Sequence, residues 1–444
     1  MPTIAAPAGT DIQPARPRPG AEVVLSHPGT GPFVQHAARA LYESGLLAAY
    51  VTTFHYDRNS LLGAVLRTAL GLVVRDADRQ LARREISEVP RHLICSHPLP
   101  EFIRMAALKG ANPITTDRVW EITEKWFDGM VARRHLRGTA AVYAYEHAAL
   151  ATFKAQKQRG GLCLYDMPIC HHAATRRWIG PEYEKFPELL TAYERHRWAL
   201  AEKRNRRKDE ELRLADRVIA ASKFVRDSLV DAGVAPEKIW QIPSGAPPVE
   251  TAGRRPDPAN FVFIMAGHLS VRKGTHYLLE AWRKLKPGGA AELWLIGNWQ
   301  LPDAMKQGLP GRVLVSPTIP RSELYARFDR ANVLVFPTLA EGLALTPLQA
   351  MSRGLPVITT PNSGCETFIR NGENGWLVPP CNPEALATAM ESAMARPADT
   401  EAVGRSAAAT VADWQWSDYR AALGAAIGNF LKPTSTIGEV TCTR

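Results

Sequence analysis

Apolar runs alternate with helical patterns in the second half of the chain, and this alternation constrains the fold more than any other feature. From Phe261 onward, six short runs of strand character are separated by helical segments, the first of them expected over 274–286. The runs are FVFIMA, ELWLI, RVLV, NVLVF, PVIT and WLV. Strands separated by helices form a parallel, doubly wound sheet. The sequence therefore predicts an α/β domain over 261–415.

The first half repeats this alternation less regularly and predicts a second domain of the same kind over 21–250. Its expected strands are 22–26, 46–53, 92–96, 140–145, 162–165, 217–221 and 238–242. A chain of 444 residues is long enough for two domains of about 200 residues each. Two such sheets that face each other enclose a cleft.

Proline-rich and polar stretches set the expected domain boundaries. Residues 1–20 predict a disordered leader and not a signal peptide, and 251–260 predict the interdomain linker. A helix over 416–431 is expected to return to the first domain, followed by a flexible tail over 432–444.

The net charge of +10 is uneven along the chain. Residues 1–250 hold 35 Lys and Arg against 28 Asp and Glu (+7), and the remainder holds 19 against 16 (+3). Within the more basic half, the segment from Leu61 to Arg84 fits either an amphipathic helix on anionic lipid or a buried helix whose arginines extend to solvent. No run approaches the roughly 20 apolar residues that span a bilayer.

Three further sequence patterns argue against a nucleic-acid partner, a zinc site and a nicotinamide dehydrogenase. The basic run from Lys203 to Lys208 continues directly into Asp209, Glu210 and Glu211, which predicts a solvated mixed-charge face and argues against nucleic acid as a partner. The six cysteines form no C-x-x-C pair, which indicates a reducing, cytoplasmic location and argues against a zinc site. No G-x-G-x-x-G motif supports a nicotinamide dehydrogenase.

The stretch from Phe336 to Glu366 is the strongest candidate for a binding site. Glu341 and Gly342 follow a predicted strand and precede a helix expected to open at Thr346, with proline next. Free amide groups at such a helix start attract diphosphates, and glycine lets the backbone approach a ligand. Gln349 fits two roles equally, a ligand contact or the second half of a capping box with Thr346.

Two turns of the first domain carry further candidates. The sequence Ser26-His27-Pro28-Gly29-Thr30-Gly31 lies between a predicted strand and a predicted helix, where a glycine pair is a weak signal on its own. A second turn follows the strand that ends near Tyr165 and contains Asp166, His171 and His172. Two adjacent histidines are expected to diverge, and with no carboxylate cluster beside them they predict no metal site.

These segments resemble the retaining nucleotide-sugar glycosyltransferases of the GT-B fold, family 4. Three signatures carry the resemblance. They are Glu341-Gly342 with Gln349 where the family has a second glutamate, AGHLSVRKG over 266–274 with His268 replacing the usual arginine, and LADRVIAASKFVRDSL followed by EKIWQIPSGA. The similarity covers most of the chain and implies two Rossmann-like domains facing a central cleft.

The resemblance also implies the chemistry and the residues that perform it. A sugar passes from a nucleoside diphosphate to a carbohydrate, lipid-linked or small-molecule acceptor, without a metal cofactor. The implied catalytic residues are Glu341, Lys273, Asp166 and His171. The implied donor-binding residues are Gly29, Thr30, Gly31, His268, Lys273, Gly342, Leu343, Ala344, Leu345, Thr346 and Gln349.

Lys273 is the expected cation because a departing diphosphate develops negative charge that a metal-free site must balance with cations and helix dipoles. Its neighbour Arg272 is expected to point to solvent. His268 and Gln349 depart from the family pattern, since a neutral imidazole cannot replace a bidentate guanidinium and an amide adds no charge. Asn362, Ser363, Gly364 and Glu366 fit equally a lining of the donor side and a plain loop.

Two alternatives remain open at this point. The same fold could support a nucleotide-sugar epimerase or phosphorylase, because fold alone does not fix chemistry. The departures at His268 and Gln349 also fit a sugar-nucleotide-binding scaffold without turnover. A transferase of polysaccharide, glycolipid or glycoconjugate synthesis, cytoplasmic or peripheral at the inner membrane face, is the favoured interpretation.

Overall fold

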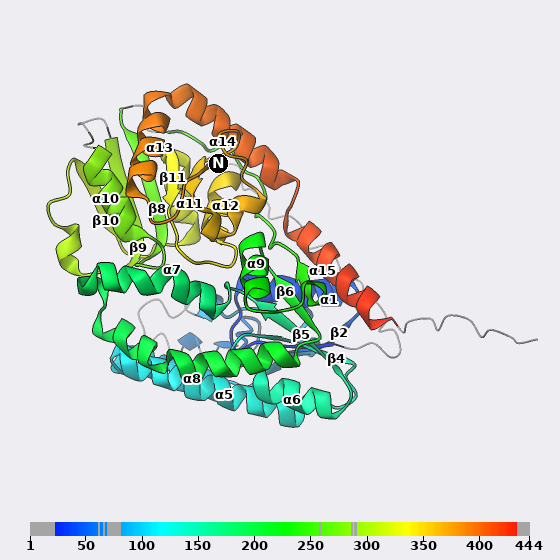
Figure 1. Ribbon diagram of the computed structural model, residues 1–444. Helices are drawn as coiled ribbons and strands as arrows, with labels where there is room; N and C mark the ends of the chain where they lie inside the picture. Colours follow the sequence, from blue (N-terminus) through cyan, green and yellow to red (C-terminus); the bar gives the residue numbers. More distant parts are fainter. Residues whose placement is uncertain are drawn as a thin grey trace, which may run out of the picture.

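A computed structural model describes residues 23–60, 63–64, 67–68, 81–256, 259–285, 287 and 291–432. Two lobes are visible in Figure 1, each a sheet with helices on its faces, and α7 (His172–Lys185) lies where the lobes meet. The predicted leader, the tail beyond Lys432 and most of the segment from Leu61 to Arg84 lie outside the described residues.

The N-terminal lobe is a seven-stranded parallel sheet, as the sequence predicts. Its strand order is β3-β2-β1-β4-β5-β6-β7. The strands are β1 (Val23–Ser26), β2 (Leu47–Thr52), β3 (Ile94–Ser96), β4 (Ala141–Tyr145), β5 (Leu162–Met167), β6 (Arg217–Ala220) and β7 (Ile239–Gln241). Its other helices are α1 (Pro32–Glu43), α4 (Leu99–Gly110), α5 (Pro113–Arg134), α6 (Leu150–Gln158), α8 (Ala192–Leu214) and α9 (Lys223–Asp231).

Side chains alternate between the two faces of this sheet along each strand, and a core packs on each face, so both faces are buried. On β1, Val23 and Leu25 pack into the core that contains α1, whereas Val24 packs into the opposite core with Phe127 of α5 and Phe153 of α6. This two-sided burial explains why the strands are continuous apolar runs without polar alternation.

The C-terminal lobe is a six-stranded parallel sheet of the same design and confirms the predicted alternation. Its order is β10-β9-β8-β11-β12-β13. The strands are β8 (Phe261–Leu269), β9 (Ala291–Trp299), β10 (Arg312–Ser316), β11 (Val333–Phe336), β12 (Val357–Thr359) and β13 (Trp376–Leu377). The helices are α10 (Thr275–Leu285), α11 (Arg321–Arg330), α12 (Leu345–Ser352), α13 (Pro383–Ala395) and α14 (Pro397–Ala412).

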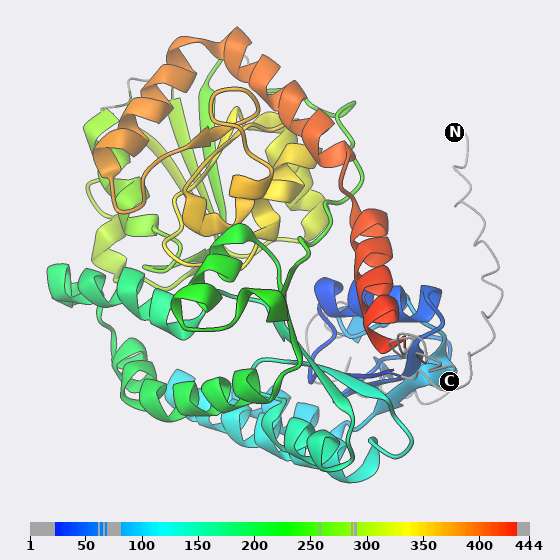
Figure 2. The ribbon, with the colours of Figure 1, turned by 45° about the vertical axis from the view of Figure 1, so that its right-hand side comes forward.

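The last helix, α15 (Trp416–Leu431), crosses from the C-terminal lobe to the N-terminal lobe (Figure 2). Gln415 and Asp418 form a capping box at its start, so the chain ends α14 and begins a new helix in another direction. Tyr419, Leu423 and Ile427 are buried in the core that contains α1. The C-terminal helix is therefore part of the N-terminal domain.

The helix α7 couples the lobes from the other side. Its Glu182 accepts a hydrogen bond from the Tyr277 hydroxyl at 3.0 Å and lies 2.8 Å from His276 Nε2, both on α10. Ile179 of α7 shares an apolar cluster with Val271 and Leu339 of the C-terminal lobe. The two lobes are thus packed together along this helix.

The charged run on α8 is only in part the solvated face that the sequence predicts. Arg204 forms ion pairs with Asp117 and Glu121 of α5, and Glu211 is fully buried. The prediction holds for Lys203, Arg206 and Asp209, which are exposed, and is wrong for the side that faces α5, whose carboxylates pair with Arg204. None of the described helices is long and apolar enough to cross a bilayer.

Candidate active site

The loops after β8 and β11 form the candidate site of the C-terminal lobe. These strands are neighbours at the centre of the sheet, where the strand order reverses direction. Ligands of open α/β sheets bind beyond the carboxyl ends of the strands at such a reversal. Lys273 follows β8 and Glu341 follows β11, and Lys273 Nζ lies 2.5 Å from Glu341 Oε1.

Backbone contacts fix the two loops against each other. Leu339 N–H donates to the Arg272 carbonyl at 2.8 Å, and the Thr338 hydroxyl donates to the same oxygen at 3.0 Å. Gly274 has φ +68°, and a Cβ at this position would lie 1.9 Å from the Pro337 carbonyl oxygen. Only glycine fits there, because it combines a left-handed conformation with this close approach.

The charges of this site are withdrawn from solvent and balanced within the group. The Lys273 and Glu341 side chains are each 12% exposed. Burial alone would raise the pKa of the Glu341 carboxyl, but the charges of Lys273 and Arg272 outweigh it and hold that pKa below its usual value. Burial lowers the pKa of Lys273 against the opposing charge of Glu341.

Arg272 does not point to solvent, so that expectation is wrong. Its guanidinium pairs with Glu341 and also donates to the Ala340 carbonyl at 3.0 Å. Its side chain is 32% exposed. The correction has a physical reason: a single buried carboxylate collects both neighbouring cations, which sequence adjacency does not reveal. The site therefore holds one carboxylate and two cations.

The helix α12 begins earlier than predicted, and the capping box between Thr346 and Gln349 does not form. Its N-cap is Ala344, without a side-chain cap, so Leu345 and Thr346 are the first two helical residues. The Ala344 N–H donates to the Ser363 carbonyl at 2.9 Å. This contact with a distant loop turns the chain into the helix before it reaches Thr346.

The polar turn after β12 supports the Glu341 loop. The Asn362 side chain donates to the Leu339 carbonyl at 2.8 Å, and Glu341 N–H donates to the Asn362 carbonyl at 3.1 Å. Glu366 accepts a hydrogen bond from the Phe224 N–H of the N-terminal lobe at 2.8 Å. The residues of this turn therefore hold the site loop and join it to the other domain.

Gly342 is the point where the lobes come closest to the site. It forms an isolated antiparallel bridge with Ile169, and a Cβ on Gly342 would lie 2.0 Å from the Pro168 carbonyl oxygen. The Ser222 hydroxyl donates to the Gly342 carbonyl at 2.6 Å. A side chain larger than hydrogen would separate the domains here. Its neighbour Leu343 is buried in the core of the C-terminal lobe.

The two positions that depart from the family pattern are both accessible. His268 ends β8 and is exposed, and its Nδ1 lies 3.4 Å from Gln300 Nε2. The protein around the ring and the nearby Lys273 lower the pKa of His268, which favours its neutral form. Gln349 is half-buried on α12, and its side chain makes no hydrogen bond to the residues that the structure describes.

In the N-terminal lobe, the glycine loop follows β1 and Gly31 is the N-cap of α1. Thr30 donates to the Arg83 carbonyl at 3.2 Å, and Gly29 N–H donates to His27 Nδ1 at 2.8 Å. His27 was not among the predicted site residues. Burial lowers its pKa to about 4, and its ring packs against Tyr145 with centroids 4.7 Å apart. Its place directly after the first strand is the signal that could have found it.

Asp166 lies on β5 among tyrosines. It is 7% exposed and accepts a hydrogen bond from the Tyr143 hydroxyl at 2.5 Å. Burial raises its pKa to about 7, against the hydrogen bond from Tyr143. Unlike Glu341, this carboxylate has no cation among its hydrogen-bonded partners in the described chain. The structure thus groups it with His27 and Tyr145, separately from the Lys273 group.

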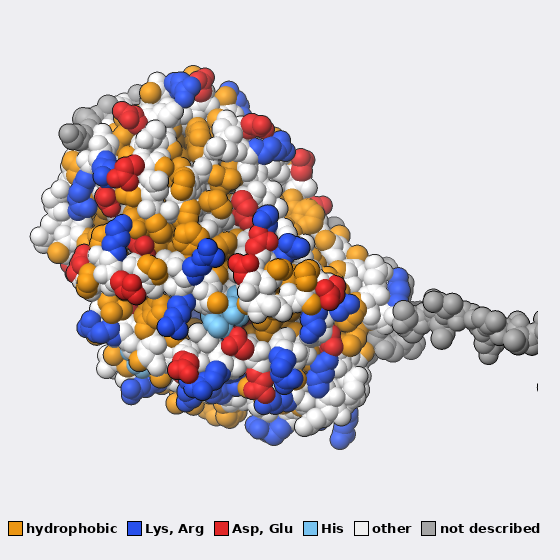
Figure 3. All heavy atoms as spheres, viewed as in Figure 1, with side chains coloured by type: hydrophobic (Ala, Val, Ile, Leu, Met, Phe, Trp, Pro, Cys, Tyr) orange, Lys and Arg blue, Asp and Glu red, His pale blue; other side chains and the backbone are white. Residues whose placement is uncertain are grey.

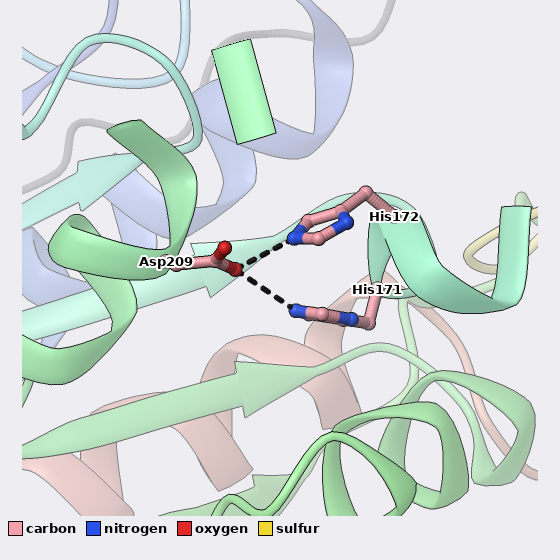
Figure 4. Close-up of side chains that lie close together, drawn as sticks. All are labelled: His171, His172 and Asp209. Carbon is pink, nitrogen blue, oxygen red and sulfur yellow. Dashed lines mark hydrogen bonds and ion pairs between the residues drawn. The ribbon is translucent and has the colours of Figure 1, made fainter. Parts of the chain in front are cut away.

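His171 and His172 converge, which corrects the expectation that they diverge. In Figure 4 both imidazoles point to Asp209 of α8. Asp209 Oδ1 lies 3.3 Å from His171 Nε2 and 2.6 Å from His172 Nε2. Asp209 lies 37 residues beyond His172 in the sequence, so a local pattern cannot show that its carboxylate is close to the histidines. These three ligand atoms lie within 4.8 Å of one another, so this group could hold a metal ion.

The predicted residues therefore fall into three groups. Lys273, Glu341, Gly342 and the start of α12 form one group in the C-terminal lobe. The glycine loop and Asp166 lie in the N-terminal lobe, and the histidine pair begins α7. The groups meet through the segment between Asp166 and His171, because Cys170 N–H donates to the Glu341 carbonyl at 3.3 Å.

Residues 252–410 match the family model of the glycosyl transferases group 1. The putative colanic acid biosynthesis glycosyltransferase WcaL of Salmonella typhimurium is 33% identical over 136 residues, which cover 28% of this chain and 34% of that protein. The lipopolysaccharide core biosynthesis glycosyltransferase LpsE of Rhizobium meliloti is 31% identical over 144 residues, 31% of this chain and 41% of that protein. The match with the curated WcaL spans about a third of its length.

Solved structures resemble nearly the whole chain. Anabaena Alr3699/HepE in complex with UDP-glucose has a TM-score of 0.57 and 15% identity, and covers 92% of this chain and 99% of that one. Sucrose-phosphate synthase from Thermosynechococcus elongatus has a TM-score of 0.59 and 18% identity, and the match covers 92% of this chain and 98% of that one. These likenesses show the fold, which is the predicted GT-B architecture of two Rossmann-like domains.

Proposed function

We propose that this protein is a glycosyltransferase that moves a sugar, of the hexosyl class, from a nucleoside diphosphate to an acceptor. The observation that carries the proposal is the largely buried pair of Lys273 and Glu341, joined by the partly exposed Arg272, at the point of strand reversal. The group lies inside the segment that matches the glycosyl transferases group 1. The UDP-glucose bound to Alr3699/HepE supports a nucleotide sugar as the donor.

In this proposal each charged group has a distinct task. Lys273 binds the diphosphate and balances the charge that develops as the bond between the sugar and the phosphate breaks. Glu341 binds sugar hydroxyls and, by pairing with both cations, holds them in place before the donor arrives. The amides of the glycine loop and of the start of α12 complete the diphosphate site. Gln349 binds the ribose.

We propose a retaining course for the reaction. The acceptor oxygen attacks the anomeric carbon on the face from which the diphosphate departs, and the acceptor proton passes to the leaving phosphate. Asp166 and His171 would lie beside the transferred sugar from the N-terminal lobe. The packing of the lobes at Gly342 supports a closed site that excludes water and limits hydrolysis.

Metal independence is part of the proposal. Two cations beside the expected diphosphate position perform the charge balancing that a divalent metal would supply. We therefore expect the initial rate to stay within about twofold after treatment with EDTA, since no step needs a metal ion. The opposite result would be a wild-type rate that falls with EDTA and returns with Zn²⁺ or Mn²⁺, together with an Asp209→Asn rate that responds to neither treatment. That result would place a required metal on His171, His172 and Asp209.

The biological setting follows from the relatives and remains a proposal. WcaL and LpsE carry names of polysaccharide and lipopolysaccharide synthesis, so we propose an acceptor in bacterial polysaccharide, glycolipid or glycoconjugate synthesis. The proposed place of action is the cytoplasm, with peripheral contact at the inner face of the membrane.

The test is release of nucleoside diphosphate by the purified full chain. UDP-, GDP-, ADP- and dTDP-sugars are supplied with a panel of soluble and lipid-linked saccharide acceptors, and NMR reports the anomeric configuration of the product. We expect release with one base, dependent on an acceptor and lost in Lys273→Ala. Arg370→Ala, an exposed control in the same lobe, should keep full activity. Release of free sugar or dependence on phosphate would instead favour an epimerase or phosphorylase. Binding of a nucleotide sugar without turnover would favour a scaffold.

A further inference from the structure

Two neighbouring helices, α4 and α5, expose large apolar side chains to solvent. Ten large hydrophobic residues are exposed in the described chain, and three of them are Val230, Leu314 and Val315. The other seven are Leu99, Phe102, Ile103, Leu108, Trp120, Ile122 and Trp126, all on these two helices. Such a concentration marks an interaction surface, whereas single exposed apolar residues need no explanation.

Most of the exposed residues follow helical spacing and form one stripe on each helix, whereas Leu108 and Trp120 lie off these stripes. On α4 the stripe contains Leu99, Phe102, Ile103 and Ala106, which recur at intervals of three and four residues. On α5 the stripe runs through Arg118, Ile122, Trp126 and Arg133, so basic residues stand at both ends of an apolar centre. Residues at these intervals lie on one face of a helix.

The charge of this hairpin is sorted by sign. Among the described side chains of Leu99–Arg134, the exposed charged ones are Arg118, Lys125, Arg133 and Arg134. The carboxylates of the same range are turned inward, with side chains at most 25% exposed, and each is ion-paired. They are Glu101 with Arg84, Asp117 and Glu121 with Arg204, Glu124 with Arg104, and Asp128 with Arg207. The outer face therefore presents cations and apolar groups together.

The hairpin is held rigidly from its inner side. Arg104 of α4 is 2% exposed and donates to the Thr123 hydroxyl of α5 at 2.8 Å. Its guanidinium also lies over the Trp120 ring, 4.4 Å from the centroid. Thr116 of α5 donates to the Ala107 carbonyl of α4 at 3.3 Å. The apolar side chains are thus presented by a packed scaffold and are not the result of a loose helix.

We infer that the outer face of the α4–α5 hairpin docks on an anionic lipid bilayer. An interfacial helix that combines aromatic and aliphatic residues with Lys and Arg partitions into the headgroup region of such a membrane. Each basic residue near the surface adds attraction to anionic lipid. Along the lower edge of Figure 3, where α5 lies in Figure 1, Lys and Arg side chains flank hydrophobic atoms.

Charge favours the bilayer over a second copy of this chain as the occupant. In a symmetric dimer the same patch meets itself, so Arg118, Lys125, Arg133 and Arg134 would face their own copies. The described part of the hairpin offers no exposed carboxylate to balance them. An anionic bilayer supplies both the apolar layer and the negative charge that this face lacks.

The surface is in contact with the last residue of the segment from Leu61 to Arg84, which the sequence marks as basic and apolar. Arg84, the last residue of that segment, pairs with Glu101 of α4 at 2.7 Å. Docking here would hold the N-terminal lobe, which we expect to bind the acceptor, against the membrane. Only this consequence, access to a lipid-linked acceptor, rests on the proposed function; the docking itself does not.

The test is flotation of the purified full chain with vesicles of phosphatidylcholine alone or with 30% phosphatidylglycerol. We expect binding to the anionic vesicles at least tenfold stronger than to the neutral ones. Binding should weaken as NaCl rises from 0.05 to 0.5 M, because salt screens exposed charges. Equal binding to both vesicles, or none to either, would overturn the inference.

Matched variants locate the surface. Ile122→Glu/Trp126→Glu should abolish flotation, whereas Leu314→Glu/Val315→Glu, with the same chemistry on β10, should not change it. Arg118→Glu/Arg133→Glu should weaken binding by about 25-fold or more, given about fivefold for each cation lost. The control Arg370→Glu/Arg405→Glu changes the net charge equally on the other lobe and should have little effect.

Circular dichroism melts show that each variant is folded, and multi-angle light scattering gives its mass without lipid. A monomer that floats only with anionic vesicles, and does so through the hairpin, supports the inference. A dimer that the Ile122→Glu/Trp126→Glu change converts to monomer would identify a second copy as the true occupant. Equal loss of flotation in the hairpin and control variants would also overturn the assignment.

Discussion

At the junction of the lobes, Glu341 withdraws Lys273 from solvent and also pairs with Arg272, whereas on the α4–α5 hairpin the carboxylates turn inward and the cations face outward. Both regions combine the same kinds of charge. In the first, the Lys273 and Glu341 side chains are each 12% exposed. In the second, Lys125 is 40% exposed although it also pairs with a glutamate.

The difference indicates how each region is used. A buried, balanced group has a fixed geometry, and removing one member leaves its partner without compensation, which is costly. Exposed cations contribute little to folding but remain free to attract an anionic partner. We therefore expect changes in the first region to affect turnover and folding, and changes in the second to affect association alone.

Of the changes proposed here, Lys273→Ala should have the largest effect on activity, because it removes a cation from the group around Glu341. We expect kcat/KM to fall by about 10²–10³-fold, the usual cost of losing one preorganised group that stabilises transition-state charge. Lys273→Arg should recover part of this loss, because it keeps the charge. Initial rates of nucleoside diphosphate release measure both variants. Activity within a factor of two of the wild type in Lys273→Ala would exclude the assigned role.

Gly274→Ala tests whether the loop geometry depends on close backbone packing. A Cβ here would lie 1.9 Å from the Pro337 carbonyl, so the loops after β8 and β11 must separate. We expect a loss of about 2–4 kcal/mol in the free energy of unfolding, by chemical denaturation. Gly308→Ala is the matched control, since Gly308 has φ +63° but nothing within 4 Å. Equal losses in the two variants would show that backbone conformation alone matters.

Asp166→Asn tests a buried carboxylate that, unlike Glu341, has no cation among its hydrogen-bonded partners in the described chain. The pKa of Asp166 in the folded protein is about 7, above its ordinary value of 3.8, so folding favours its protonated form. Its contribution to stability is therefore complete below about pH 4 and is lost as the pH rises through 7. Relative to the variant, the wild type should lose stability over this window, by about 1.4 kcal/mol for each pKa unit of the shift. Denaturation at pH 4, 5.5 and 7.5 measures the difference; parallel curves would contradict it.

Arg118→Glu/Arg133→Glu should have the smallest effect on folding. Both side chains are exposed, so we expect the melting temperature to stay within about 2 °C of the wild type, because exposed charges contribute about 0–1 kcal/mol. Thermal melts at low and high salt give the comparison with Lys273→Ala. A loss of more than about 5 °C would show that the outer charges support the hairpin, and would blur the contrast between the two regions.

The sequence predicts what depends on local periodicity. Both sheets follow from apolar runs such as Val333–Phe336, because parallel strands buried on two faces are continuously apolar. The placement of Lys273 in the turn after β8 and of Glu341 in the turn after β11 also follows, although the sequence does not predict their ion pair. The structure shows that the two side chains form an ion pair.

What the sequence misses depends on contacts between distant segments. The true start of α12 at Leu345 is set by the Ser363 carbonyl, and the convergence of His171 and His172 by Asp209 of α8. The exposure of Ile122 and Trp126 depends on such contacts too, because only the packing of α4 against α5 reveals that they are left exposed.

The most direct test of the central claim is calorimetric titration of UDP, GDP, ADP and dTDP into the wild type, Lys273→Ala and Arg370→Ala. The claim is that the group of Lys273, Arg272 and Glu341 binds a nucleoside diphosphate. It predicts that one nucleotide binds with a stoichiometry of one, that Lys273→Ala weakens this binding by at least tenfold, and that Arg370→Ala does not change it. Equal affinity in all three proteins, or no binding to folded wild type, would contradict it.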